Sequence, residues 1–105
     1  MPSLPYELIS LDLDMTLLDP QLRISPRNLA ALRRCRELGV KALISSGRMH
    51  ASTLGYQRVL DLDTPTVSYN GAFIKRESTG EVLLHRQLDL QVARDLVEVC
   101  DREGV

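Results

Sequence analysis

Two aspartates that lie two positions apart carry the clearest chemical signal in this chain. Asp12 and Asp14 follow a short apolar run, residues 8–11, which is typical of a buried strand. Neighbouring carboxylates repel each other unless a proton or a cation lies between them. The pair is therefore costly unless something positive is held there, which favours a site for a divalent metal. The alternative is a strand end whose aspartates only cap and solubilise a turn.

A serine and a glycine form the second candidate. Ser46 and Gly47 follow a second predicted strand, residues 40–44, which a predicted helix joins to the first. The strand, helix, strand order predicts a parallel pair, so this turn should emerge at the sheet edge that carries Asp12. The hydroxyl and backbone N–H groups of such a turn can hold a phosphate, although Ser-Gly alone is often a plain helix cap. Its coupling to the aspartates favours the phosphate interpretation.

An Asn-Gly dipeptide follows a third predicted strand, residues 66–69. Asn70 and Gly71 are typical of a tight turn between extended segments. Residues 72–76 and 81–85 then predict the two strands of an antiparallel hairpin. A turn is therefore one interpretation of this dipeptide.

Local start and stop signals bound the predicted helices that must position these residues. Ser25 caps the first helix, and Gly39 ends it where a left-handed residue is wanted. The second helix is predicted from about residue 49 to residue 60, with His50 on its surface. Asp89 caps the last helix.

Bulk composition narrows the range of partners. The 105 residues are 44% hydrophobic and 26% charged with a net charge of -1, which leaves no electrostatic footprint for nucleic acid or an anionic membrane. No basic N-terminal region precedes an apolar core and no run nears ~18 apolar residues, so we expect a cytoplasmic protein. Cys35 and Cys100 fall on apolar helix faces, which favours core packing over a disulfide or a metal site.

Three stretches, in this order, resemble the motifs of the haloacid dehalogenase-like (HAD) phosphohydrolases: residues 12–18, 43–48 and 65–72. The resemblance is to the N-terminal portion of the Cof-like subclass (type IIB). It implies an α/β fold, a HAD-like Rossmannoid three-layer sandwich with a partial parallel sheet, followed by the start of an α+β cap domain. The core is expected over residues 1–84 and the beginning of the cap over residues 85–105.

The same resemblance implies catalytic roles. Asp12 is expected to be the nucleophile and Asp14 the general acid/base. Both are expected to be Mg²⁺ ligands, Asp14 through its backbone carbonyl. The backbone N–H of Leu13, together with Ser46 and Gly47, is expected to hold the phosphoryl oxygens.

The resemblance also implies a rim around the substrate. This rim is expected to contain Arg48, Asn70 and Gly71. The Asn-Gly dipeptide therefore has two interpretations, a turn and part of the substrate rim. Residues 17–24, two extended pieces around an Asp-Pro turn, are expected to form a flap beside the site. Met15 departs from the family pattern, because glycine is common there and the loop must tolerate a Cβ. The family's later lysine and acidic pair have no counterpart in this chain.

The function implied is a Mg²⁺-dependent phosphatase that acts on small phosphorylated metabolites, such as sugar phosphates, through an aspartyl phosphate. The expectation applies to a longer parent protein, and the 105 residues alone are expected to be inactive. One alternative is a non-catalytic truncated piece of such an enzyme. Another is a phospho-receiver signalling domain, which needs an aspartate at the end of its third strand, where this chain has Tyr69 and Asn70.

The predicted strand order has a consequence for association. Three parallel strands fit the order 3-2-1 of a doubly wound sheet, which leaves the strand before Asp12 at an exposed edge. Because an unpaired apolar edge is a template for association, we expect self-association through it.

Overall fold

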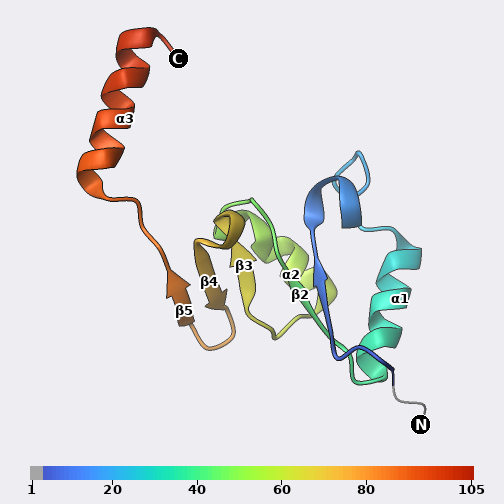
Figure 1. Cartoon of the computed structure of the whole chain (residues 1–105). Helices are drawn as coiled ribbons and strands as arrows, with labels where there is room; N and C mark the ends of the chain where they lie inside the picture. The colour runs from blue at the N-terminus through green and yellow to red at the C-terminus, as the bar shows by residue number, and fades with distance from the viewer. Residues whose placement is uncertain (1–3) are drawn as a thin grey trace.

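The computed structural model describes residues 4–105, so residues 1–3 of the predicted core lie outside it. Strands and helices alternate in the first half of the chain, and short single turns (η) join some of them (Figure 1). In chain order the elements are β1 (Leu8–Leu11), η1 (Leu13–Leu17), α1 (Pro26–Glu37), β2 (Lys41–Ile44), η2 (His50–Thr53), α2 (Leu54–Leu60), β3 (Thr66–Ser68), η3 (Tyr69–Gly71), β4 (Phe73–Arg76), β5 (Glu81–His85) and α3 (Leu90–Glu103).

The first three strands have the predicted order. β1 and β2 pair in parallel, with Leu11 opposite Ile44. β3 joins beside the end of β2 through a parallel bridge between Ser45 and Val67. Within residues 4–105, β1 has no second neighbour, so it forms the edge of the parallel strands as expected. The carboxyl ends of β1 and β2 therefore lie together, and each leads into a candidate site loop.

The predicted hairpin is also present. β4 pairs antiparallel with β3, with Ser68 opposite Phe73, and β5 pairs antiparallel with β4. The five strands thus combine a parallel part that carries the aspartates with an antiparallel part at its other side. The α/β arrangement expected from the sequence is the one observed.

The connecting helices α1 and α2 lie side by side. Arg36 of α1 donates a hydrogen bond to the carbonyl of Leu60 at the end of α2, at 3.1 Å. The cap predicted at Ser25 is confirmed, because its hydroxyl accepts the N–H of Asn28 at 3.1 Å. Gly39 has a φ of +87°, the left-handed conformation in which the chain leaves α1 for β2.

The hydrophobic core lies directly beneath the loop that carries the two aspartates. Leu13 and Leu17 of η1 are buried. They belong to a cluster completed by Leu18, Ile44 and Leu60. Burial of one such side chain contributes about 1.5–3 kcal/mol. Since Leu13 lies between Asp12 and Asp14, its burial anchors the loop while both carboxylates stay at the surface.

The second helix begins differently from the prediction. The turn η2 precedes α2, and the expectation that His50 lies on the surface is wrong, since only 12% of its side chain is exposed. The His50 Nε2 atom lies 2.7 Å from a carboxylate oxygen of Glu77, and its ring centroid lies 5.4 Å from that of Phe73. The hairpin of β4 and β5 therefore covers the start of η2, a long-range contact that local spacing does not encode.

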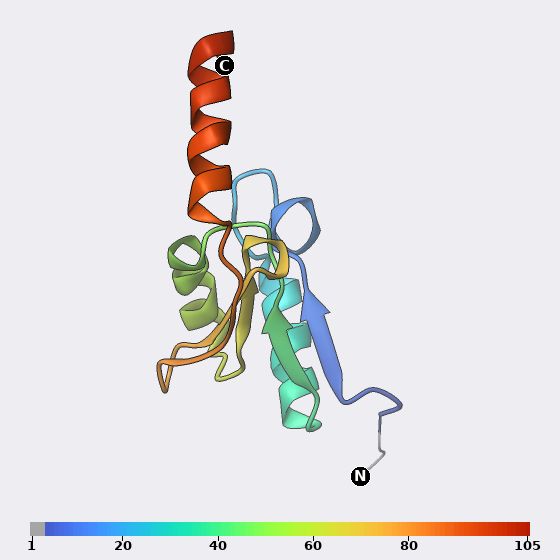
Figure 2. The same ribbon diagram turned by 60° about the vertical axis from the view of Figure 1, so that its left-hand side comes forward.

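Helix α3 stands away from the sheet in both views (Figures 1 and 2). Its cap is as predicted, because the Asp89 carboxylate accepts the N–H groups of Gln91 and Val92. Cys100 is exposed on this helix, so its predicted core packing is wrong, whereas Cys35 is half-buried. The division into a core and a cap that begins at residue 85 stays a prediction. Within the described residues, no helix has the length and hydropathy needed to cross a bilayer.

Candidate active site

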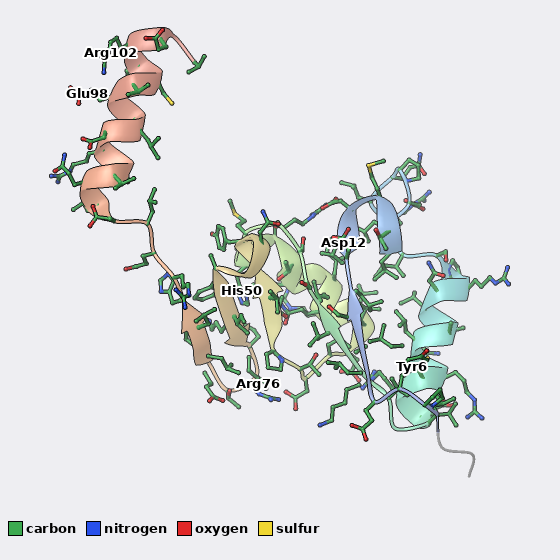
Figure 3. All side chains as sticks on the ribbon, viewed as in Figure 1. Tyr6, Asp12, His50, Arg76, Glu98 and Arg102 are labelled. Carbon is green, nitrogen blue, oxygen red and sulfur yellow. The ribbon has the colours of Figure 1, made fainter. Side chains whose placement is uncertain are left out.

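The loop after β1 is organised by the first aspartate. The Asp12 carboxylate accepts the N–H of Leu13 at 2.9 Å through Oδ1 and the hydroxyl of Thr16 at 3.1 Å through Oδ2. The N–H of Leu18 donates to the carbonyl of Leu13 at 2.9 Å, which closes the turn. Asp12 thus has a defined orientation at the carboxyl end of β1, where it is exposed to solvent (Figure 3).

One contact in this loop bears on a predicted role. The N–H of Leu13 is expected to hold a phosphoryl oxygen, but here it donates to Asp12. A phosphate can use this donor once the Asp12 carboxylate turns toward it. The assignment of Leu13 therefore stays a prediction.

Met15 occupies the position where the family commonly has glycine. Its φ is +60° and its ψ is +13°, in the left-handed region. This conformation costs a residue with a Cβ about 1–2 kcal/mol. The side chain is 99% exposed, so its own packing does not offset that cost. The backbone geometry explains why glycine suits this position.

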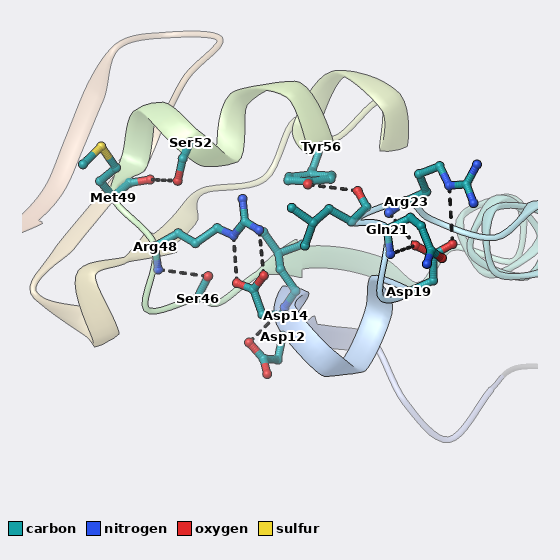
Figure 4. Close-up of polar contacts among 12 residues, drawn as sticks. Asp12, Asp14, Asp19, Gln21, Arg23, Ser46, Arg48, Met49, Ser52 and Tyr56 are labelled. Carbon is teal, nitrogen blue, oxygen red and sulfur yellow. Dashed lines mark hydrogen bonds and ion pairs between the residues drawn. The ribbon is translucent and has the colours of Figure 1, made fainter.

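The second aspartate is paired with an arginine from the loop after β2. Arg48 donates to the Asp14 carboxylate in a bidentate manner, through Nε at 2.8 Å and Nη2 at 2.6 Å (Figure 4). The Arg48 hydrogen bonds hold the pKa of Asp14 below its ordinary value, because a guanidinium favours the ionised carboxylate. Arg48, expected only at the rim, therefore contacts the candidate general acid/base directly.

The loop after β2 brings the buried Ser46 hydroxyl to the site, and its role in binding phosphate stays a prediction. Ser46 is buried, and its Oγ accepts the N–H of Arg48 at 3.1 Å. A hydroxyl that accepts one bond still has its own hydrogen to donate, and a phosphoryl oxygen is a suitable acceptor. The backbone N–H of Ser46 donates to Val67 at 2.9 Å, so β3 holds this turn in place.

Gly47 is required by its neighbour on the next loop. A Cβ at this position would lie 2.8 Å from Oδ1 of Asn70, closer than Cβ atoms in proteins essentially ever come, so the Asn70 side chain would have to shift. The N–H of Asn70 also donates to the carbonyl of Ser46 at 3.1 Å. These contacts bring the second and third sequence motifs together.

The Asn-Gly dipeptide forms a turn, as one interpretation predicts. Asn70 and Gly71 lie in η3, between β3 and β4, and both have positive φ values, +55° and +98°. The turn is longer than a two-residue hairpin, because Ser68 is opposite Phe73. The contact of Asn70 with Gly47 supports the rim role as well, which stays a prediction.

Two features of the site were not expected from the sequence. Tyr56 of α2 places its ring 5.3 Å from the guanidinium carbon of Arg48 and donates its hydroxyl to Leu22 in the flap. His50 lies two residues after Arg48 and is tied to Glu77. Neither position belongs to a motif, so only the packing of α2 and η2 identifies them.

The donors present are compatible with part of a Mg²⁺ shell. Among residues 4–105 no arginine or lysine forms an ion pair with Asp12, so its carboxylate is open to a cation. The Asp14 carbonyl is a second hard oxygen. The described residues contain no group of three acidic, histidine or cysteine side chains. Mg²⁺ takes several of its ligands from water and from substrate phosphate, so these two protein oxygens can form part of its coordination shell.

Comparison with known proteins identifies the class. A family model described as haloacid dehalogenase-like hydrolase matches residues 9–105. The chain belongs to this family. The three motifs, the α/β fold and the relatives together confirm the resemblance to its Cof-like subclass that the sequence predicted.

Several relatives are phosphatases. The chain is 37% identical to a 5-amino-6-(5-phospho-D-ribitylamino)uracil phosphatase of Bacillus subtilis, over all of this chain and 39% of that protein. It is 33% identical to the pyridoxal phosphate phosphatase of Escherichia coli, over 92% of this chain and 36% of that one. A haloacid dehalogenase-like hydrolase from Bacteroides thetaiotaomicron superimposes with a TM-score of 0.84 at 30% identity, over 94% of this chain and 38% of that one. The chain thus spans less than two fifths of these relatives.

Proposed function

We propose that the protein containing this chain is a Mg²⁺-dependent phosphatase that acts on small phosphorylated metabolites, sugar phosphates among them. The observation that carries the proposal is the meeting of the two aspartates with the Ser46 turn at the carboxyl ends of β1 and β2. The relatives support it, since the names of two describe phosphatases of small phosphorylated molecules.

The first chemical step uses both aspartates. A carboxylate oxygen of Asp12 attacks the substrate phosphorus, and the bond from phosphorus to the alcohol oxygen breaks. Asp14 in its protonated form gives the leaving oxygen its proton. The Arg48 pair keeps Asp14 ionised, so Arg48 must turn away before Asp14 takes up that proton.

The second step returns the enzyme to its starting state. Water attacks the phosphorus of the aspartyl phosphate, Asp14 accepts the proton of that water, and the bond from phosphorus to Asp12 breaks. This step needs the ionised form of Asp14, which the Arg48 hydrogen bonds favour by lowering the pKa of Asp14. Throughout, the Ser46 hydroxyl and the backbone of Gly47 hold the phosphoryl oxygens. Mg²⁺, held by the Asp12 carboxylate and the Asp14 carbonyl, would supply positive charge that reduces the repulsion of the anionic nucleophile and the phosphate.

The experiment is substitution of the nucleophile in the full-length protein. We expect Asp12→Asn to abolish hydrolysis of p-nitrophenyl phosphate while circular dichroism shows an unchanged fold. Asp101→Asn, on exposed α3, is the matched control and should retain activity. Activity of Asp12→Asn near that of the wild type contradicts the nucleophile assignment.

A further inference from the structure

The side chain of Tyr56 contacts both the flap and the arginine that pairs with Asp14. Its hydroxyl donates to the carbonyl of Leu22, at 3.1 Å, and its ring faces the guanidinium of Arg48, 5.3 Å from the centroid (Figure 4). Leu22 belongs to the flap, residues 17–24, whose two ends are joined by an antiparallel bridge between Leu18 and Ile24. One side chain of α2 thus contacts both the flap and the partner of Asp14.

The flap needs such an anchor because its turn is strained. Leu22 has a φ of +60°, and its side chain is half exposed, so burial does not hold it there. Within the flap, the Asp19 carboxylate accepts the N–H groups of Gln21 and Arg23, each at 2.9 Å. These bonds shape the turn but do not attach it to a neighbouring element. A left-handed leucine persists only where the surroundings define it, and the Tyr56 bond supplies that connection to α2.

The arginine needs support for a different reason. A long guanidinium side chain loses conformational freedom when it is held in one bidentate pair at the surface, which weakens exposed ion pairs. The Arg48 side chain is 22% exposed, with the Asp14 carboxylate on one side and the Tyr56 ring on another. The ring thereby limits the rotamers from which Arg48 reaches Asp14. A contact of this kind at a partly exposed site changes an equilibrium about two- to fivefold.

We propose that Tyr56 is a positioning residue that joins the flap to the Asp14–Arg48 pair. Its ring sets the guanidinium against the general acid/base, and its hydroxyl holds the flap turn. The kinetic part of this inference rests on the proposed function. The two contacts are chemically separable, because phenylalanine keeps the ring and loses the hydroxyl, whereas leucine loses both.

The test compares Tyr56→Phe and Tyr56→Leu in the full-length protein with Tyr6→Leu as the matched control. Tyr6 is 72% exposed and lies at the opposite end of β1 from Asp12 (Figure 3). Hydrogen exchange of the flap amides and the NMR signal of the Arg48 Nε–H group report on the two contacts without any need for turnover. The kcat and KM for p-nitrophenyl phosphate report on the consequence for chemistry.

The hydroxyl contact predicts faster exchange at the flap in both Tyr56 variants. Loss of one hydrogen bond should accelerate exchange of the Leu22 and Arg23 amides about two- to tenfold, with no change in Tyr6→Leu. Unchanged exchange in Tyr56→Phe overturns the flap anchor. This variant keeps the packing of the ring, so the result stands even if Tyr56→Leu fails to fold.

The ring contact predicts a difference between the two variants. Tyr56→Leu should weaken the protected Arg48 Nε–H signal. Because the second step needs the ionised Asp14 that Arg48 favours, Tyr56→Leu should also lower kcat about two- to fivefold with KM nearly unchanged. Tyr56→Phe should keep the wild-type signal and the wild-type kcat. A retained signal and an unchanged kcat in folded Tyr56→Leu overturn the positioning role. If the wild-type protein shows no phosphatase activity, the proposed function fails, and the NMR signal alone decides whether Tyr56 positions Arg48.

Discussion

At the scale of single residues, the two aspartates of the site differ in their hydrogen-bond partners. Asp14 is held by Arg48, whereas Asp12 is bonded only to uncharged donors of its own loop. Under the proposed function, an anionic substrate would meet Asp12 directly and compete with Asp14 for the guanidinium. Under the proposed function, these different partners would separate the two carboxylates into a nucleophile and a proton carrier.

Removal of Arg48 should change how Asp14 titrates. Because a guanidinium favours the ionised carboxylate, we expect Arg48→Gln to raise the pKa of Asp14 toward its ordinary value of 3.8. A carbon-13 NMR titration of the Asp14 carboxyl group measures this shift. Arg33→Gln, on the exposed face of α1, should leave the titration unchanged. An identical Asp14 titration in wild type and Arg48→Gln contradicts the pairing.

The strained Met15 backbone gives a second prediction. Met15→Gly removes the left-handed penalty of about 1–2 kcal/mol but adds about 0.5–1 kcal/mol of chain entropy, so the free energy of unfolding should rise slightly or stay constant. Met49 is the control, because its φ is -62° and a glycine there would relieve no left-handed strain. Met49→Gly should therefore destabilise by about 0.5–1 kcal/mol. Urea denaturation measures both, and equal destabilisation contradicts the role of the Met15 backbone.

Residue types and their order were sufficient to predict that the two aspartates and the Ser46 turn lie at the same end of the sheet, whereas their catalytic roles stay predictions. Asp12, Asp14 and Ser46 are recognisable because each comes directly after a predicted strand or in the loop that follows it. Tyr56 was not recognisable, because its role depends on how α2 lies over the flap. The direct contact of Arg48 with Asp14 likewise depends on a separation of 34 residues along the chain.

At the scale of elements, local signals predicted the ends of helices well. The caps at Ser25 and Asp89 are confirmed, since a cap depends only on residues within one turn. The start of the second helix and the burial of His50 were missed. The burial of His50 depends on the β4–β5 hairpin, which lies more than 20 residues further along the chain.

The contact between that hairpin and η2 should be sensitive to pH. The hydrogen bond from His50 holds the pKa of Glu77 below its ordinary value. Glu77 therefore contributes stability above its unfolded-state pKa, and this contribution is lost as the pH falls through the lower folded-state pKa. Since 43% of the Glu77 side chain is exposed, the effect should be at most about 1 kcal/mol.

Glu77→Gln should show a smaller loss of stability on acidification than the wild type. Urea midpoints at neutral pH and near pH 3 measure this difference. Glu98→Gln is the matched control, because Glu98 lies on α3 away from the hairpin (Figure 3). An acid response of Glu77→Gln equal to that of the wild type contradicts the role of the His50–Glu77 contact.

At the scale of the whole molecule, two surfaces have no partner within the described residues. β1 has one open edge, and the apolar side chains of α3, Val92, Leu96 and Val99 among them, are exposed. Helical periodicity predicted that these side chains share a face. It could not predict that α3 lies apart from the sheet, because a local pattern does not specify what an apolar face packs against.

The open edge of β1 predicts self-association of the 105-residue chain. Since Glu7 and Leu11 direct their carbonyls to β2, strand alternation directs the Ser10 N–H to the open edge. We expect dimers or larger species by size-exclusion chromatography with light scattering, and fewer of them in Ser10→Pro. The same chain should show no Mg²⁺-dependent phosphatase activity. A 105-residue chain that elutes as a monomer and hydrolyses a phosphate ester contradicts this prediction.

The central claim is that Asp12 forms a covalent bond to phosphorus, and phosphopeptide mapping tests it most directly. The full-length Asp14→Asn protein is mixed with Mg²⁺ and p-nitrophenyl phosphate, whose leaving group needs no proton from Asp14, and is then quenched in acid. It should retain the phosphoryl group because the proton acceptor for water is missing. Mass spectrometry should locate that group on Asp12 and find none in Asp12→Asn. A phosphoryl group on another residue, or turnover by Asp12→Asn, contradicts the account.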